Sequence, residues 1–188
     1  EDKKFVYTVH VKAENEKKIL KKVHSNNVMS TNERHYSFPK PGDQPLETRP
    51  VIVGSGPAGL FCAWYLARAG YRPLVLERGE EADKRMETVN RFWKTGVLDP
   101  ESNVQFGEGG AGTFSDGKLN TLVKDSSGRN REVLKRFTEA GADPEILYQQ
   151  KPHLGTDVLV NIVQTMRRQI EEMGGTFRFR SKVTDLYT

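Results

Sequence analysis

The sequence predicts an α/β fold in which parallel strands are flanked by helices, and three observations support this. An apolar β-branched run from Val51 to Val53 ends at a glycine-rich turn. A stretch of good helix formers then runs from Pro57 to Ala69 and stops at Gly70. A second apolar run, Leu74 to Leu76, follows and ends at Glu77. Strand, turn, helix and strand in this order form the βαβ unit of a Rossmann-like domain.

The turn after the first strand has the spacing of a dinucleotide-binding fingerprint, with glycines at positions 54, 56 and 59. Gly54 permits the tight turn, Gly56 lets the backbone approach a pyrophosphate, and Gly59 lets the helix pack against its strand. Proline suits the first helical position, and the helix dipole points at the phosphates. The expected cofactor-binding residues of the turn are Gly54, Ser55, Gly56, Pro57, Ala58 and Gly59.

Glu77 lies eighteen positions after Gly59, close to the spacing of about 20 residues at which an acid accepts the ribose hydroxyls of a dinucleotide. Its carboxylate would repel a 2′-phosphate, so we expect an unmodified ribose. A helix is expected from Glu81 to Lys94, with its start near the phosphates. Arg78 or Arg85 is therefore a candidate for neutralising pyrophosphate charge, and an ordinary surface arginine is the alternative for each.

A second informative stretch is rich in glycine, with five glycines among the eleven positions from Gly107 to Gly117. Such a loop brings backbone amides close to something flat or anionic. A flexible surface loop is the alternative, but Phe106, Phe114 and Leu119 are unusual in flexible linkers. We therefore expect a loop that lines a cofactor, with contacts from Gly109, Gly110, Gly112, Thr113, Ser115, Gly117 and Lys118.

The N-terminal part predicts a piece of a small α/β module. Residues 4–12 alternate as a strand does, residues 14–24 form a helix with a buried stripe, and Arg34 to Phe38 is a candidate strand. A proline-rich linker over residues 39–45 marks a boundary. We therefore divide the chain into a module with linker, residues 1–47, and a dinucleotide-binding domain, residues 48–188.

The C-terminal part predicts helices over residues 130–140 and 144–148, with Asp143 as the N-cap of the second, and a longer helix from Asp157 to Met173. Strands are expected over residues 176–180 and 183–187. The chain begins with Glu1 instead of Met, and its last strand would have nothing after it to pair with. We therefore expect a piece of a longer protein.

Composition narrows the function classes. Lysine and arginine number 29 against 25 acidic residues, a formal charge of +4, and residues 1–50 hold ten basic and seven acidic side chains. This positive charge would allow nucleic-acid binding, but lysines on a solvated helix face are the better explanation of the charge. The single cysteine, Cys62, excludes an internal disulfide and is expected to be a small core residue. The four histidines show no metal spacing, and no apolar run indicates a membrane segment, so a cytoplasmic protein is expected.

These motifs resemble those of a known flavoprotein class. The fingerprint from Gly54 to Leu60, with Glu77 to Gly79, resembles the FAD-binding domain of the glutathione-reductase-like flavoproteins. The stretch from Asn103 to Asn120, above all Gln105 to Leu119, resembles a narrower bacterial group, the FAD-dependent dehydrogenases also called NAD(FAD)-utilising dehydrogenases. The similarity runs from about Phe5 to the end of the chain.

The resemblance implies FAD as the cofactor, with its pyrophosphate on the glycine turn and its adenosine ribose on Glu77. It also implies that residues 109–118 run near the flavin, where loop amides or Lys118 would stabilise the reduced flavin anion, and that the backbone of Val183 lies beside the adenine. Members of this group continue well past Thr188 with the rest of a split FAD domain and a substrate domain. NAD(P)H is a candidate electron donor, and the small-molecule substrate stays open.

Three functions remain from the sequence. The first is the FAD-binding portion of a flavin-dependent oxidoreductase, for which the second glycine-rich stretch argues. The second is an NAD-binding dehydrogenase domain, which predicts continuous βαβ units after Glu77. The third is a non-catalytic nucleotide- or RNA-binding module that uses the basic N-terminal half. No nucleophile with an adjacent base is visible, so no catalytic residue is predicted.

Overall fold

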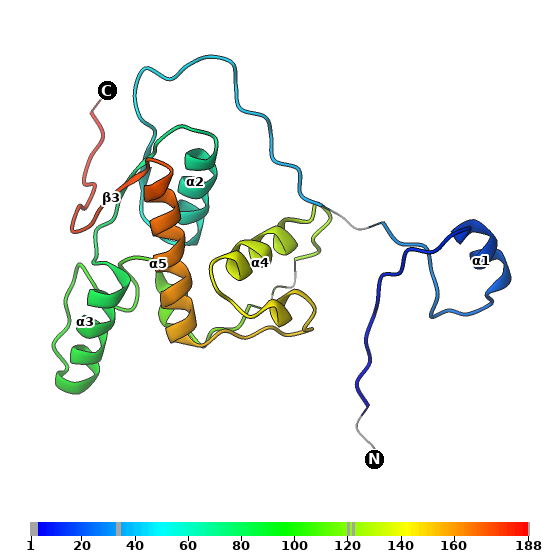
Figure 1. Cartoon of the computed structure of the whole chain (residues 1–188). Helices are drawn as coiled ribbons and strands as arrows, with labels where there is room; N and C mark the ends of the chain where they lie inside the picture. The colour runs from blue at the N-terminus through cyan, green and yellow to red at the C-terminus, as the bar shows by residue number, and fades with distance from the viewer. Residues whose placement is uncertain (1–3, 33–34, 120, 122, 188) are drawn as a thin grey trace.

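The α/β prediction is confirmed by the computed structural model, which describes residues 4–32, 35–119, 121 and 123–187. Figure 1 shows short strands beside two long helices, with the N-terminal segment extending away from them. The elements in order are α1 (Glu16–Lys22), β1 (Val51–Val53), α2 (Pro57–Arg68), β2 (Leu74–Leu76), α3 (Ala82–Thr95), the 3-10 helix η1 (Ala111–Phe114), α4 (Arg129–Glu139), the 3-10 helix η2 (Pro144–Leu147), α5 (Thr156–Glu172) and β3 (Thr176–Arg178).

The three strands form one parallel sheet in the order β1, β2, β3. Ile52 pairs with Val75, which pairs with Phe177, so these three residues lie in one row across the sheet. Because side chains alternate along a strand, this row points to one face. All three belong to the hydrophobic core, and Val75 is fully buried. Val51 and Val53 point the other way and stay 56% and 61% exposed.

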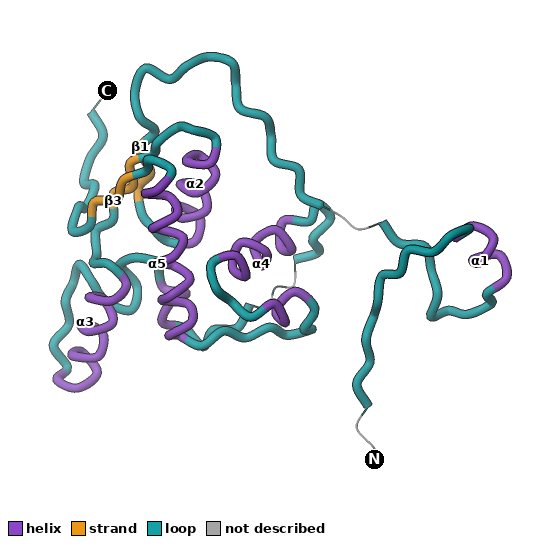
Figure 2. Tube along the Cα trace, in the orientation of Figure 1, coloured by secondary structure: helices purple, strands orange, loops and turns teal. Residues whose placement is uncertain are grey.

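The core lies between the sheet and a pair of adjacent helices, α2 and α5 (Figure 2). Helix α5 has the expected apolar stripe, because Ile162, Val163, Met166 and Ile170 are all buried. Trp64 of α2 is buried among them, and its indole nitrogen donates to Gln169 of α5 at 2.9 Å. This packing fixes the start of α2, where the glycine turn lies.

The helical predictions after residue 48 are confirmed within a residue or two at each end. Asp143 also has the predicted capping role, because its carboxylate accepts a hydrogen bond from the amide of Glu145 at 2.8 Å. Cys62 is an exception to the predicted core. It is exposed on α2, because it lies on the side of that helix turned away from α5.

The N-terminal module differs from the prediction. Residues 4–13 form no strand, and Phe5, Tyr7, Val9 and Val11 are 71–88% exposed. A strand needs a hydrogen-bonded neighbour, and none of the described residues provides one. Helix α1 forms as predicted but buries no residue, so its expected buried stripe is wrong. Residues 35–38 are also without strand structure, and Arg34 lies outside the described residues.

The C-terminal end differs for a related reason. Strand β3 ends at Arg178, and residues 183–187 form no strand, because no further strand of the described chain lies beside them. The predicted strand over residues 183–187 is therefore wrong. Among the described residues, we find no helix with the length and apolar character needed to cross a membrane.

Candidate dinucleotide site

The glycine turn connects β1 to α2 at the carboxyl end of the sheet. Gly54 has φ of +90°, a conformation that favours glycine, and its amide donates to the Leu76 carbonyl at 2.8 Å. A Cβ on Gly59 would come within 2.0 Å of the Gly54 carbonyl oxygen, so only glycine fits there. Helix α2 begins at Pro57 with Gly56 as N-cap, no capping side chain and no acid in its first turn. Its first amides and its dipole are therefore available to an anion.

Glu77 lies at the end of β2, where the sequence predicted it. Its side chain is buried, and one carboxylate oxygen accepts hydrogen bonds from both the amide and the hydroxyl of Ser55, each at 2.8 Å. The other oxygen accepts from the Gly79 amide at 2.9 Å. The acid is thus held against the glycine turn. The oxygen that bonds Ser55 already accepts two hydrogen bonds, whereas the oxygen that bonds Gly79 keeps one lone pair for a further donor.

The glycine-rich loop folds back onto the same turn. The Gly109 amide donates to the Ser55 carbonyl at 3.0 Å, and a Cβ on Gly110 would meet the Gly56 Cα at 3.0 Å. Thr113 is buried beneath the loop, where its hydroxyl leaves no room for a side chain on Gly109. Two stretches that are far apart in the sequence therefore form one backbone surface at the start of α2.

Arg85 of α3 holds this loop through hydrogen bonds to its backbone. It is fully buried on α3, and its guanidinium donates to five backbone carbonyls, at 2.7–3.3 Å, belonging to Asn103, Val104, Gly107, Glu108 and Gly110. Burial lowers the pKa of Arg85 to about 10, while the carboxylates of Glu77 and Glu108 act in the opposite direction. Arg85 is therefore charged at neutral pH, and its guanidinium binds the backbone carbonyls of the loop.

A buried carboxylate completes this support. Glu108 is fully buried and accepts from the Ala82 amide, at the start of α3, at 2.7 Å and from Arg167 of α5 at 2.8 Å. Burial raises the pKa of Glu108, although the ion pair with Arg167 acts against this rise. The loop is thus fastened to α3 and α5 through one side chain.

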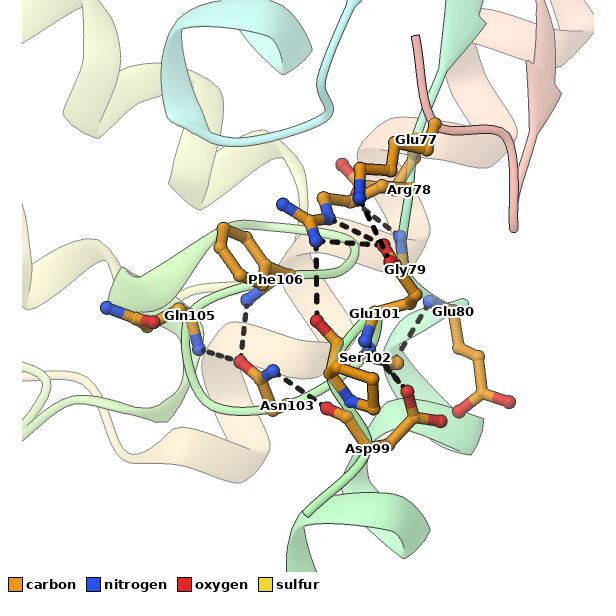
Figure 3. A network of polar contacts seen from close by, with 12 residues as sticks. Glu77, Arg78, Gly79, Glu80, Asp99, Glu101, Ser102, Asn103, Gln105 and Phe106 are labelled. Carbon is orange, nitrogen blue, oxygen red and sulfur yellow. Dashed lines mark hydrogen bonds and ion pairs between the residues drawn. The ribbon is translucent and has the colours of Figure 1, made fainter. Parts of the chain in front are cut away.

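Arg78 lies in a polar network beside the site (Figure 3). Its guanidinium stacks 3.7 Å from the ring centre of Phe106 and pairs with Glu101 at 2.8 Å. Asn103 caps the loop that carries Phe106, because its side-chain oxygen accepts from the amides of Gln105 and Phe106. Neither predicted phosphate arginine points freely at the glycine turn: Arg78 is stacked and paired, and Arg85 is neither a surface residue nor free to bind phosphate.

The remaining predicted residues divide into two groups. Just before Val183, the Arg180 amide donates to the Gly79 carbonyl at 3.0 Å, and the Ser181 amide donates to the Glu77 carbonyl at 2.8 Å. This segment therefore runs beside Glu77. The far end of the loop lies elsewhere, because the Gly117 carbonyl accepts from the Leu154 amide at 2.9 Å and Lys118 is exposed and paired with Asp116 at 2.9 Å. Ser115 donates to the carbonyl of Gly112.

Sequence reasoning missed the roles of Arg85, Glu108 and Arg167. A signal for Arg85 exists, because Ala82, Arg85 and Val89 share the three- and four-residue spacing of one buried helix face. An arginine in that pattern indicates a buried cation with a backbone partner. Glu108 and Arg167 are 59 positions apart, and no local pattern connects them.

Comparison with known proteins agrees with this geometry. The model of the family described as NAD(P)-binding Rossmann-like domain matches residues 52–106, from β1 to Phe106. An uncharacterized protein of Clostridium beijerinckii is 48% identical over 182 residues, which is 97% of this chain and 34% of that protein. The chain therefore spans about a third of the length of this relative.

Shorter similarities point to named enzymes. An L-glutamate oxidase precursor of Streptomyces viridosporus is 41% identical over 69 residues, 34% of this chain and 10% of that protein. A thiamine thiazole synthase of Saccharolobus islandicus is 58% identical over 33 residues, 18% of this chain and 12% of that protein. Together with the parallel sheet and the glycine turn, these similarities are consistent with a Rossmann-like dinucleotide-binding domain.

Proposed function

We propose that this Rossmann-like domain is the FAD-binding portion of a flavin-dependent oxidoreductase. The observation that carries the proposal is the return of the glycine-rich loop onto the dinucleotide turn, through Gly109 on Ser55 and Gly110 against Gly56. A purely NAD-binding domain predicts continuous βαβ units after Glu77. Here β2 is followed instead by α3, the loop, α4 and α5 before β3 begins.

The residues present fit a dinucleotide. The pyrophosphate would lie on the uncapped start of α2, where a Cβ on Gly56 would have only the Gly110 Cα near it, at 3.8 Å. Glu77 would accept a ribose hydroxyl with the one lone pair left on the oxygen that bonds Gly79, and the segment that leads to Val183 would border the adenine. A bound flavin supplies the redox chemistry. The chain's own contribution is to bind and orient it.

The proposed contacts of the loop follow from which amides are already engaged. Gly109 and Gly110 donate to Ser55 and Gly107, so they hold the loop in place. The Thr113 amide donates to the Gly110 carbonyl at 3.3 Å, so Thr113 also holds the loop, and Gly112, in η1, is the proposed neighbour of the flavin end. Lys118 would reach it only after leaving Asp116. An electron donor such as NAD(P)H and the small-molecule substrate are proposed to act at parts of the protein beyond this turn.

A second candidate is a domain that binds NAD(P) itself, because the family model that matches residues 52–106 is described by that cofactor. The two candidates differ in a direct measurement. Titration of the chain into FAD, followed by flavin fluorescence anisotropy, is expected to show saturable binding at one FAD per chain. NAD and NADP are titrated in parallel by calorimetry. Binding of NAD without FAD would favour the second candidate and contradict the first.

Glu77→Gln provides the residue test. Loss of the charged acceptor is expected to weaken FAD binding by about 10- to 100-fold, because a hydrogen bond to a charged group contributes about 1.5–3 kcal/mol. Glu87→Gln on the exposed side of α3 is the matched control and should leave the affinity unchanged. Circular dichroism of both variants checks that the fold is retained. Unchanged FAD binding in Glu77→Gln would remove Glu77 from the site.

A further inference from the structure

A large pocket lies on the other side of α2 from the core. It is bounded by α2, α4 and residues 36–41, which include the start of the proline-rich linker and are called the linker from here on, and it has a volume of about 1030 Å³. This is at the upper end of the range of about 300–1,000 Å³ for small-molecule sites. Its lining shares no residue with the glycine turn or the glycine-rich loop. The pocket is therefore separate from the candidate dinucleotide site.

Aromatic rings form much of its wall. Phe38 of the linker stacks on Tyr65 of α2 with ring centres 3.8 Å apart and planes inclined by 17°. Tyr36 and Phe38 are nearly perpendicular, with ring centres 5.4 Å apart and planes inclined by 84°. Phe61 and Tyr71 also line the pocket. Flat rings in offset or edge contact are suited to hold another flat ring.

The charge of the lining is strongly positive. Lys40, Arg68, Arg129 and Arg136 line the pocket, and Glu132 is the single acid among the lining residues. Glu132 is already engaged, because it accepts from the Tyr65 hydroxyl at 2.9 Å and pairs with Arg136 at 3.1 Å. In the part of the chain that the structure describes, no ion pair offsets Lys40, Arg68 or Arg129.

Arg129 and Arg68 lie close to aromatic rings. The Arg129 guanidinium is 5.6 Å from the ring centre of Tyr36, and that of Arg68 is 5.3 Å from the ring centre of Trp64. A cation held near aromatic rings can bind an anionic group while the rings bind an aromatic one. Both halves of such a ligand thus have partners in the same pocket.

We propose that this pocket binds a small planar aromatic molecule that carries a negative charge. The aromatic part packs against the wall formed by the stacked pair Phe38 and Tyr65 and its neighbours, without entering between the two stacked rings, and Arg129 and Arg68 bind its anionic group. The linker is a wall of the site, so the ligand fastens the linker to α2. This site is additional to the dinucleotide turn and does not depend on which dinucleotide the turn binds.

Cys62 allows a direct test, because it lines the pocket and is the single cysteine of the sequence. The uncharged disulfide 2,2′-dithiodipyridine reports the access to its thiol through the release of thiopyridone. The probe is 2-naphthoate, and 2-naphthamide is its uncharged analogue. At a concentration ten times its dissociation constant, 2-naphthoate is expected to slow the reaction of Cys62 about tenfold, while the amide slows it less than about twofold.

Two variants and one control assign the effect to the pocket. Arg129→Gln removes an exposed cation and is expected to raise the naphthoate concentration for half-protection by about fivefold. Phe38→Ala should weaken protection by both compounds. Arg91→Gln on the exposed side of α3 should match the parent chain. Equal protection by naphthoate and naphthamide, absence of protection, or an unchanged Arg129→Gln would overturn the proposal.

Discussion

At the scale of single residues, the Arg85 guanidinium donates to five main-chain carbonyls, three in the glycine-rich loop and two just before it. Its replacement by methionine would leave five buried carbonyls without these donors. We expect Arg85→Met to lower the free energy of unfolding by about 3–5 kcal/mol, as for one partner lost from a buried charged network. Urea unfolding followed by circular dichroism measures this. Arg91→Met, exposed on the same helix, should change it by less than about 0.5 kcal/mol.

A pair of glycines in the same loop provides a second prediction. Gly109 has φ of +84°, and an added Cβ would lie 2.1 Å from the Thr113 hydroxyl, whereas Gly112 has no atom within 4 Å of that position. Gly109→Ala is therefore expected to lower the free energy of unfolding by about 1–3 kcal/mol. Gly112→Ala should keep parental stability. If both variants unfold at the same urea concentration as the parent, the described loop conformation is wrong.

At the scale of elements, α1 and the segment before it have few contacts to protect them. Helix α1 has seven residues and none is buried, and helices shorter than about 12 residues are marginal without tertiary packing. We expect amide exchange of residues 4–22 to be complete within seconds, while α5 exchanges far more slowly. Mass spectrometry of peptides from α1 and α5 makes the comparison. Slow exchange in α1 would mean that it packs against another surface.

The same contrast predicts where a protease cuts. Lysines of α1 are exposed, while Arg49 is fixed by hydrogen bonds to the carbonyls of Arg72 and Pro73 and to the Thr176 hydroxyl. Brief trypsin treatment should therefore leave a resistant fragment that begins after Lys22 and retains the proposed domain from residue 48 onward. Cleavage between residues 57 and 178 before α1 is cut would contradict this expectation.

At the scale of the whole molecule, Arg180 joins the segment after β3 to two acids. It bonds Glu80 at 2.6 Å and Asp99 at 3.0 Å. The Arg180 hydrogen bond lowers the pKa of Asp99 below its usual 3.8. Burial alone would raise the pKa of Glu80, but bonds from Arg180 and Thr88 bring it below 4.5. Both carboxylates therefore bind protons more weakly in the folded chain than in the unfolded chain.

Because the pKa values of Glu80 and Asp99 are lowered in the folded chain, the direction in which stability changes with pH follows. Stability from these two acids is fully present above their unfolded-state pKa values and is lost as the pH falls through them toward the lower folded-state values. Arg180→Gln should flatten this acid-side loss in urea unfolding measured from pH 6 to pH 3. Glu108, whose pKa is raised, changes stability with pH in the opposite direction. Because it pairs with Arg167 instead of Arg180, its contribution is the same in the parent chain and in Arg180→Gln and cancels in their difference. A parallel loss in both proteins would contradict the assignment.

The sequence predicted what is set locally. The fingerprint, Glu77 and the apolar stripe of α5 each follow from short spacings, and the structure contains the corresponding turn, strand end and buried face. Strands at both ends were predicted wrongly, because alternation indicates a strand only where a partner exists, as residues 4–12 demonstrate. Arg85 was misread for another reason: its role depends on a loop that returns from elsewhere in the chain.

The pairing of β2 with β3 also sets an order of events during synthesis. The carbonyl of Glu77 accepts from the Ser181 amide and the Glu77 amide donates to the Arg178 carbonyl, whereas helix α2 ends at Arg68 and the glycine turn bonds only as far along the chain as Leu76 and Glu77, apart from the returning loop. Contacts that close long loops form late and slowly. A nascent chain leaving the ribosome would therefore expose helix α2 well before β3 and the segment beside Glu77 exist. If the proposed dinucleotide site is correct, cofactor added during translation would meet only part of it until α5 and β3 have emerged.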